Sequence, residues 1–304
     1  MNSFDVIMPI AAKDVEIMTY GLPNFFEFLP IKKLVIIGNN EVHIKIQSII
    51  NRYNIEFLLE DELLSLDAVK KEMNRVCNND LYAVKRSGWY LQQFIKMMYA
   101  FICEDEYYLV WDSDTFPLRK VCMMDGTKPI FHMKNEYYSS YFDTMSRIIP
   151  NLGKLEKRSF IAEHMLISTD IMKKLICEIE MNDNLDGKRF YQKILSAIDK
   201  SMLSHSGFSE FETYGNYCEM RFPDLYEKRD WMSLREGSKY FLLSNFNKSE
   251  EKWIAKEYMA ISFEHGMLMK KEAPIYHCLL VQALFSFNKL TSIFEKIRNL
   301  KKRK

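Results

Sequence analysis

Two aspartates one residue apart, Asp112 and Asp114, are the residues whose types and spacing most directly indicate chemistry. They follow an apolar run, Tyr107 to Trp111, which has the length and composition of a buried strand. In an extended segment residues i and i+2 lie on the same side, so both carboxylates can converge on one point. Two like charges that close repel each other unless a cation or hydrogen-bond donors neutralise them. A hard divalent ion, Mg²⁺ or Mn²⁺, shared with substrate phosphates meets that need.

A surface turn is the alternative explanation of the same segment. Asp-Ser-Asp-Thr-x-Pro is good turn chemistry, because Asp and Ser side chains bond to nearby backbone and proline presets the chain. The context favours a binding site, since the aspartates end a strand that follows three earlier predicted strands. Ligands of an open α/β sheet bind outside the carboxyl ends of its strands.

The elements around the aspartates predict a doubly wound α/β sheet. Strands are expected at 4–12, 32–39 and 55–63, with helices at 13–29, interrupted at Pro23, and at 41–54. An amphipathic helix at 88–103 precedes the aspartate strand. Further strands are expected at 128–134 and 160–169 and within 220–231, helices at 170–181 and 187–200, a helix followed by a strand within 252–266, and a final helix at 275–300.

Composition bounds the class of protein. The chain has 304 residues, 48% of them hydrophobic, which is enough for a large core, and its net charge of +1 gives no bias towards nucleic acid. Six scattered cysteines without a CxxC pair, no signal peptide and no apolar stretch of membrane-spanning length favour a cytoplasmic protein. We expect one domain, 1–304, with a nucleotide-donor half at 1–118, an acceptor half at 119–270 and a C-terminal basic helix at 271–304. The basic end of that helix suggests peripheral contact with anionic lipid at the inner face of the plasma membrane.

Four segments between residues 87 and 217 resemble one protein family. They are "SGWYLQQFIKM", "YLVWDSDTFPL", "FIAEHMLIS" and "FSEFETYGNY". Together they resemble bacterial nucleotide-sugar glycosyltransferases with the GT-A fold and a DxD motif, of the kind associated with capsule, O-antigen or other surface polysaccharides. The resemblance implies a Rossmann-like, mixed, mostly parallel sheet flanked by helices. It also implies a metal-dependent, hexosyltransferase-type enzyme that moves a sugar from a nucleotide-diphosphate donor, a UDP-sugar above all, to a glycan or lipid-linked glycan.

The resemblance also implies a metal site that uses Mn²⁺ or Mg²⁺. Asp114 would bind the ion and the diphosphate, and Asp112 would meet either the ion or the ribose of the donor. A later histidine often completes such a site. His265, at the end of a predicted strand, is the expected ligand, and His277 is the alternative.

Donor-binding residues are expected at two further places. The end of the first strand would hold the uracil or other base, and Lys96, with Arg86 ahead of the same helix, would approach the diphosphate. The alternative is an ordinary amphipathic helix whose polar face meets water. The full expected donor set is Pro9, Ile10, Ala11, Asp14, Arg86, Gln93, Lys96, Asp112 and Ser113.

Two glutamates two residues apart, Glu210 and Glu212, are candidates for the catalytic base. In an extended segment both would face one side, and the aromatic residues around them would raise a carboxylate pKa towards neutrality. An inverting transferase needs one such base to take the proton of the acceptor hydroxyl. Glu210 is the first choice and Glu212 the second; a solvated acidic turn is the alternative. In an enzyme that retains configuration, these glutamates would instead bind sugar.

A second pair of polar residues, Glu163 and His164, lies inside the predicted strand at 160–169. A charged residue there is costly unless it is paired or used. With Trp89, this pair is expected to contact the donor sugar or the acceptor. The alternative is a structural histidine whose hydrogen bonds are satisfied.

Two other functions are compatible with the same carboxylates. A sugar nucleotidyltransferase would share the sheet, but it should carry a glycine-rich phosphate loop after its first strand, and "MPIAAKDVEIM" has none. In a non-catalytic nucleotide-sugar-binding or assembly module, the metal site would be vestigial.

Overall fold

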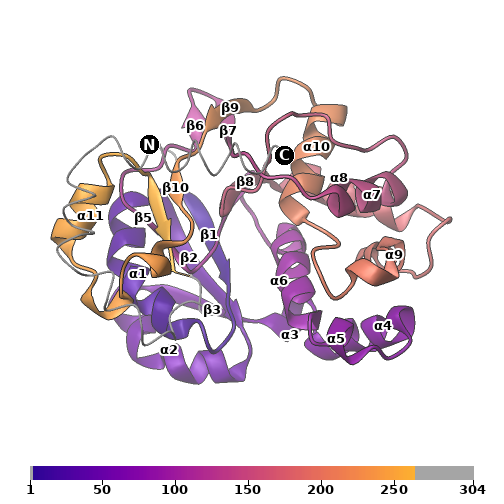
Figure 1. Ribbon diagram of the computed structural model, residues 1–304, viewed down its shortest axis with the longest axis horizontal. Helices are drawn as coiled ribbons and strands as arrows, with labels where there is room; N and C mark the ends of the chain where they lie inside the picture. Colours follow the sequence, from indigo (N-terminus) through magenta and orange to yellow (C-terminus); the bar gives the residue numbers. More distant parts are fainter. Residues whose placement is uncertain (1–2, 264–304) are drawn as a thin grey trace.

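The computed structural model describes residues 3–263 and contains a five-stranded sheet with the strand order β3-β2-β1-β4-β8 (Figure 1). The first four strands of the chain are parallel, and β8 runs antiparallel beside β4. The predicted mixed, mostly parallel sheet flanked by helices is therefore confirmed. Its strands are β1 (Phe4–Pro9), β2 (Ile31–Gly38), β3 (Ile55–Leu59), β4 (Tyr107–Trp111) and β8 (His164–Ser168).

Helices cover both faces of this sheet. Figure 1 shows α1, α2 and α11 on one side and the helices from α4 to α10 on the other. The α-helices are α1 (Val15–Phe28), α2 (Asn40–Tyr53), α3 (Glu60–Leu63), α4 (Leu66–Cys77), α5 (Leu81–Val84), α6 (Ser87–Met98), α7 (Ser139–Ile148), α8 (Thr169–Glu180), α9 (Phe190–Ala197), α10 (Glu210–Arg221) and α11 (Lys248–Ile254). The short 3₁₀ helices are η1 (Tyr99–Phe101), η2 (Lys200–Met202), η3 (Gly237–Lys239) and η4 (Leu243–Asn245).

Two small sheets complete the described chain, in the orders β10-β11-β5 and β6-β7-β9. Their strands are β5 (Thr115–Pro117), β6 (Met124–Asp125), β7 (Lys128–Met133), β9 (Glu227–Asp230), β10 (Ser233–Leu234) and β11 (Ala260–Ser262). Because β5 follows the two aspartates directly and pairs with β11, the chain on both sides of Asp112 and Asp114 is held in a sheet.

Polar caps mark where helices begin. The Asn39 side chain accepts a hydrogen bond from the backbone N–H of Val42, so α2 begins directly after β2 ends at Gly38. Ser65 caps α4 in the same way, by accepting from the N–H of Ala68. These caps satisfy N–H groups that have no partner inside the helix.

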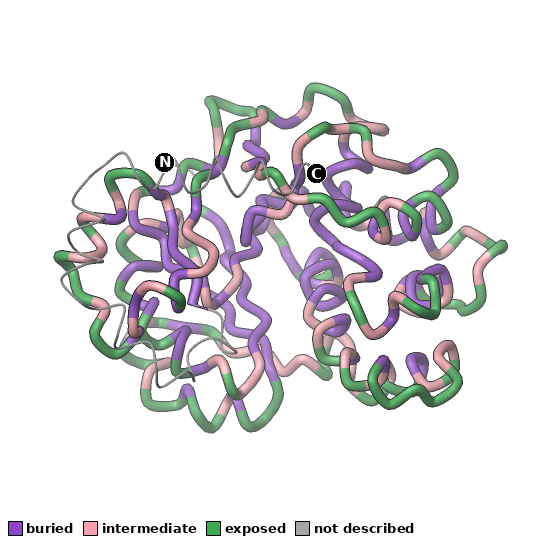
Figure 2. The backbone as a smooth tube through the Cα atoms, viewed as in Figure 1, coloured by how far each residue is buried: buried purple, intermediate pink, exposed green. Residues whose placement is uncertain are grey.

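The hydrophobic core forms two clusters, one on each face of the central sheet. Figure 2 shows buried residues along the strands of this sheet and exposed residues at the periphery. Alternation along β1 divides its residues between them: Val6 and Met8 belong to one cluster, and Ile7 belongs to the other. A sheet buried on both faces explains why β1, β2 and β4 appear as nearly continuous apolar runs.

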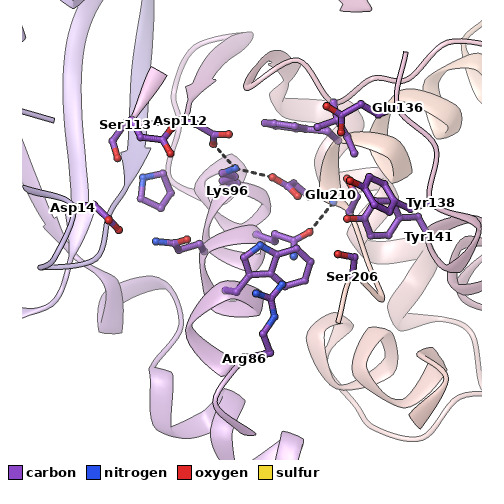
Figure 3. Close-up of a pocket in the computed structure, with 18 of the residues that line it drawn as sticks. Asp14, Arg86, Lys96, Asp112, Ser113, Glu136, Tyr138, Tyr141, Ser206 and Glu210 are labelled. Carbon is purple, nitrogen blue, oxygen red and sulfur yellow. Dashed lines mark hydrogen bonds and ion pairs between the residues drawn. The ribbon is translucent and has the colours of Figure 1, made fainter. Parts of the chain in front are cut away.

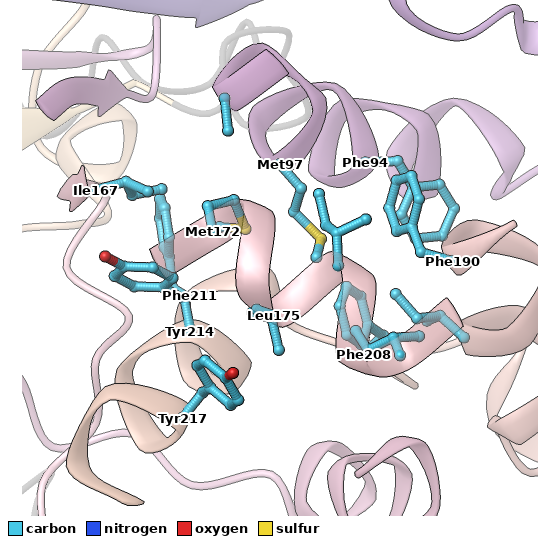
Figure 4. Packing of buried hydrophobic residues seen from close by; sticks show 14 of the residues in the cluster. Phe94, Met97, Ile167, Met172, Leu175, Phe190, Phe208, Phe211, Tyr214 and Tyr217 are labelled. Carbon is cyan, nitrogen blue, oxygen red and sulfur yellow. The ribbon is translucent and has the colours of Figure 1, made fainter. Parts of the chain in front are cut away.

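The cluster that contains Ile7 also fixes α6 against α10. Phe94 and Met97 of α6 and Phe211 and Tyr214 of α10 are all buried in it (Figure 4). These helices come from the two expected halves of the chain, so the core itself sets the position of one relative to the other.

The predicted interruption of the first helix is wrong. Helix α1 runs through Pro23 to Phe28. A proline inside a helix costs about 3 kcal/mol, but Pro23 is exposed while its neighbours Leu22, Asn24 and Phe25 are buried. Packing of this face offsets the lost backbone hydrogen bond.

The predictions for the C-terminal part, including His265, His277 and the basic helix at 271–304, fall outside the described residues. The division of the chain into two halves stays a prediction. Between residues 3 and 263 no helix has both the length and the apolar character needed to cross a membrane.

His164 lies in a buried aromatic cluster that joins β4, β7 and β8. Its ring stacks on Trp111 at 4.5 Å, and Trp231 packs edge-on at 4.4 Å. The His164 Nδ1–H donates to the carbonyl of Ala162 at 2.8 Å, which leaves Nε2 to accept from Nδ1–H of His132 at 2.7 Å. Both imidazoles are neutral in this arrangement. Burial lowers the pKa of His132 to about 4 and also lowers the pKa of His164.

The hydrogen-bonded pair of His132 and His164 predicts that the folded protein loses stability in acid. A depressed histidine pKa means that the unfolded chain binds protons before the folded protein does, so stability present above pH 6.5 is lost as the pH falls towards 4. The contribution of His132 is about 3 kcal/mol. Urea unfolding from pH 7.5 to 4 should therefore show a shallower loss of stability in His132→Asn than in the wild type. The exposed His205 provides the control substitution, His205→Asn. Equal slopes for His132→Asn and wild type would contradict the prediction.

Candidate active site

A cavity of about 490 Å³ opens at the carboxyl end of the central sheet, where residues after β1 and β4 face α6 and α10 (Figure 3). Much of the predicted site lies here. The predicted residues that line it are Pro9, Asp14, Arg86, Trp89, Gln93, Lys96, Asp112, Ser113, Asp114 and Glu210.

The segment with the two aspartates is a turn fixed by several backbone hydrogen bonds. The N–H of Asp112 donates to the carbonyl of Glu163 at 2.9 Å, and the N–H of Thr115 donates back to the carbonyl of Asp112 at 3.1 Å. The N–H of Phe263 donates to the carbonyl of Asp114 at 2.8 Å. The segment is therefore a turn, as the alternative explanation expects, and both aspartates of this turn line the cavity.

The Lys96 ammonium lies between two carboxylates at the centre of the site. Its Nζ is 2.8 Å from Oδ1 of Asp112 and 2.8 Å from Oε1 of Glu210, and it lies 4.6 Å from the centre of the Phe211 ring (Figure 3). Burial alone would lower the pKa of Lys96, but the attraction of Asp112 and Glu210 outweighs burial and raises it. The ammonium stays charged and joins the turn after β4 to α10.

Glu210 reaches the cavity from the first turn of a helix, so the predicted extended conformation of this segment is wrong. Ser209 caps α10 by accepting from the N–H of Glu212 at 3.3 Å. The N–H of Glu210 itself donates to Oε1 of Gln93 at 3.2 Å, a second link between α6 and α10. A Ser followed three residues later by Glu is a helix-start signature, and this signal was present in "FSEFETY".

Helix geometry separates the two glutamates. Glu212 does not line the cavity. Its carboxylate accepts from Oγ–H of Ser159 and from Nδ2–H of Asn216 at 3.1 Å, and burial raises its pKa. In a helix, residues i and i+2 do not share a face, which is why only Glu210 meets Lys96.

Four other predicted residues do not line the cavity: Ile10, Ala11, Glu163 and His164. Glu163 precedes β8 and is not inside it, and its φ of 62° is left-handed. Its buried carboxylate accepts hydrogen bonds from Lys134, Trp231 and Ser233. These side-chain contacts fix Glu163, whose backbone carbonyl accepts the hydrogen bond from the N–H of Asp112. The predicted contact of Glu163 with sugar stays a prediction.

Beyond the predicted set, the cavity is also lined by Lys13, Gln92, Glu136, Tyr138, Tyr141, Ile161, Ser206, Ser209, Phe211 and Arg235. Glu136 and Tyr138 follow β7, as the aspartates follow β4. Their position after a predicted strand was a usable signal. Gln92 lies one turn before Lys96 on α6, a spacing visible in the sequence.

Arg86 forms the floor of the cavity with Trp89. Its guanidinium carbon lies 4.1 Å from the centre of the Trp89 ring, and Nη2–H donates to the carbonyl of His205 at 3.4 Å. A guanidinium held over an aromatic ring keeps its direction and its charge, so it can meet an anionic or hydroxylated ligand.

The described residues supply oxygen ligands for a metal ion, but not a complete set. Between residues 3 and 263 no group of three or more His, Cys, Asp or Glu is arranged to hold one. Carboxylates are the ligands that Mg²⁺ and Mn²⁺ prefer, and Mg²⁺ is commonly bound by one or two protein carboxylates together with substrate phosphates and water. Asp112 and Asp114 fit that mode of binding.

Sequence comparison assigns the chain to a family. Residues 1–300 match the model described as "Family of unknown function (DUF6492)". The chain belongs to this family. No curated protein sequence matches it.

Three solved structures show limited similarity to this chain. Mouse xyloside xylosyltransferase 1 in its apo form shares 10% identity at a TM-score of 0.40, over 77% of this chain and 88% of that one. A glycosyltransferase involved in glycosylation of the major capsid of PBCV-1 shares 11% identity at a TM-score of 0.34, over 87% of this chain and 96% of that one. The apo bifunctional glycosyltransferase WbbM shares 11% identity at a TM-score of 0.39, over 86% of this chain and 45% of that one. Similarity at this level does not assign an activity.

The buried ion pairs of Lys96 predict a large effect on stability. Lys96→Met leaves the Glu210 carboxylate buried without its cation, and breaking such a pair costs about 3–5 kcal/mol. Adding Glu210→Gln removes the stranded charge, so the double variant should regain much of the loss. Free energies of unfolding measured in urea for the two single variants and the double variant test this coupling. Additive effects of the two substitutions would show that the pair does not hold α6 to α10.

Proposed function

We propose that the protein is a metal-dependent glycosyltransferase that moves a sugar from a nucleotide-diphosphate donor, a UDP-sugar, to a glycan or lipid-linked glycan. One observation carries the proposal. The two aspartates that follow β4 share a cavity with a buried carboxylate, Glu210, and a buried cation, Lys96. The cavity lies at the carboxyl edge of the sheet, where α/β proteins bind their ligands.

Asp112 and Asp114 would hold the ion, with the donor diphosphate as a further ligand. The Asp112 side chain keeps 36% of its surface exposed even while one oxygen meets Lys96. When bound, the ion would supply positive charge that stabilises the departing diphosphate. His265 remains the proposed protein ligand beyond the described residues. Phe263, two residues earlier in the sequence, donates a backbone hydrogen bond to the carbonyl of Asp114, which supports that choice.

The donor nucleotide would lie along the ends of β1 and β4. Pro9 and Asp14 line the cavity there, and Ile10 and Ala11 lie between them in the chain. We assign the base to this edge and the ribose to Asp112 or Ser113. The diphosphate then falls near Asp114, and Arg86 supplies a positive charge at the floor.

Glu210 would act on the acceptor. In an inverting displacement its carboxylate takes the proton of the acceptor hydroxyl while the oxygen attacks the anomeric carbon. The bond from that carbon to the diphosphate breaks, and the diphosphate leaves with the electron pair. The Lys96 ammonium, 2.8 Å from Oε1 of Glu210, orients the carboxylate for this step. In a retaining enzyme Glu210 would instead bind the sugar.

The cellular setting follows from the family resemblance of the four sequence segments. We propose a hexosyl transfer in the synthesis of a bacterial surface polysaccharide, at the cytoplasmic face of the membrane. The basic segment at 296–304 supports contact with anionic lipid.

Substitution of Asp114 tests the metal role. Asp114→Asn removes a charged ligand from the proposed ion site, so Mn²⁺-dependent hydrolysis or transfer from a UDP-sugar should fall by about 100-fold in kcat/KM. A thermal-shift titration of UDP with and without Mn²⁺ should show that the variant loses the metal-dependent part of binding. Asp61→Asn, at an exposed position on α3, is the matched control. Full activity of Asp114→Asn would exclude this role.

Substitution of the two glutamates tests the base. Glu210→Gln should lower kcat by about 100-fold or more while UDP affinity stays within about twofold, because the base acts in the chemical step. Glu212→Gln is the matched control, since Glu212 bonds to Ser159 and Asn216 outside the cavity. It should lower stability and leave kcat nearly unchanged. The opposite ranking of the two kcat values would assign the base to Glu212.

A further inference from the structure

The cavity has a second wall that faces the sheet edge. It consists of Glu136, Tyr138, Tyr141 and Ser206, and we refer to these four residues as the second wall. Figure 3 shows them across Lys96 and Glu210 from Asp14, Asp112 and Ser113. They come from the segment between β7 and α7, from α7 itself and from the segment before α10. None of them belongs to the proposed donor or metal set.

Polar atoms without partners lie in and beside this wall. Within the described chain, Nε of Arg86, Nε2 of Gln93 and Oε2 of Glu136 are buried and make no hydrogen bond. Gln93 is 4% exposed, and its other amide atom is already used by the N–H of Glu210. Leaving such atoms unpaired is costly, so a ligand that satisfies them is expected.

The chemistry of these atoms selects the kind of ligand. Arg86 and Gln93 offer donors, and Glu136 offers an acceptor. A hydroxyl both donates and accepts, so a polyhydroxylated molecule can satisfy all three. A phosphate only accepts, and the carboxylate of Glu136 would repel it. Arg235 does not remove this acceptor, because its ion pair uses Oε1 and leaves Oε2.

The tyrosines add an apolar surface of suitable shape. Tyr138 keeps 44% of its surface exposed, and its ring lies 5.2 Å from that of the buried Tyr141. Burial raises the pKa of Tyr141 to about 12, so its phenol keeps its proton and can donate. An exposed aromatic face beside polar groups suits a sugar ring, which has apolar C–H faces and a polar edge.

We propose that the second wall binds the acceptor of the transfer as a sugar ring, packed on Tyr138 and hydrogen-bonded through its hydroxyls to Glu136 and Gln93. This inference rests on the proposed function and names the acceptor class for the same cavity. An acceptor sugar held here lies beside Glu210, between the second wall and the donor edge. The wall would therefore select the acceptor, and the sheet edge would select the donor.

A binding experiment with methyl glycosides tests the proposal. The probes are methyl hexosides, 6-deoxyhexosides, N-acetylhexosaminides and heptosides, titrated into the full chain with UDP and Mn²⁺ while the fluorescence of the cavity residue Trp89 and the other tryptophans is followed. At least one glycoside should bind saturably. Tyr138→Ala should weaken that glycoside about tenfold through loss of ring contact. Tyr138→Phe keeps the ring and should bind within about twofold of wild type.

The neighbouring Tyr137 provides the matched control. It is 66% exposed and does not line the cavity, so Tyr137→Ala should bind the glycoside as wild type does. Glu136→Gln should also weaken the glycoside about tenfold. Every variant should bind UDP with Mn²⁺ within about twofold of wild type.

The outcomes separate this inference from the proposed function. If UDP binds with Mn²⁺ but no glycoside binds, or if Tyr138→Ala changes nothing, the second wall is not an acceptor site and the donor site stands. If UDP does not bind at all, the proposed function fails whatever the glycosides do. Equal losses in Tyr137→Ala and Tyr138→Ala would likewise overturn the assignment, because the effect would then not come from the cavity.

Discussion

The ammonium group of Lys96 is buried and has to be neutralised, and the arrangement of the site follows from this constraint. Burying a charge is costly unless partners of opposite sign meet it at close range. Its two partners come from different parts of the chain: Asp112 follows β4, which lies between β1 and β8 in the sheet, and Glu210 begins α10. The two ion pairs of Lys96 therefore join the edge of the sheet, after β4, to the first turn of α10. The candidate site lies where these two parts meet.

The packing around this point makes the arrangement rigid. Phe94 and Met97 of α6 and Phe211 of α10 share one buried cluster, so apolar contacts hold the two helices while the polar contacts orient their side chains. The amide of Gln93 adds a direct hydrogen bond to the first turn of α10. On the sheet side, the carbonyl of Glu163 fixes the backbone of Asp112.

Much of the fold could be predicted from local patterns. The strands β1, β2 and β4 are apolar runs because both faces of the sheet are buried, and caps such as Asn39 mark helix starts. The position of Asp112 and Asp114 at a strand end was predictable for the same reason. The helix through Pro23 was not, because burial of the opposite helix face outweighed a local rule. The helical start at Glu210 was missed although Ser209 and Glu212 carried its signature.

The sequence by itself determined the sheet, the helices around it and the two carboxylates at its edge, because each depends on residues close together in the chain. Only the tertiary structure decided which glutamate faces the cavity and what Lys96 contacts. Lys96 and Glu210 are 114 residues apart, and no periodicity reports a contact over that distance. The tertiary structure likewise put His164 into a hydrogen-bonded aromatic cluster and brought Tyr138 to the cavity. A buried charge and a buried donor each require a partner, but the partner is chosen by how the elements pack.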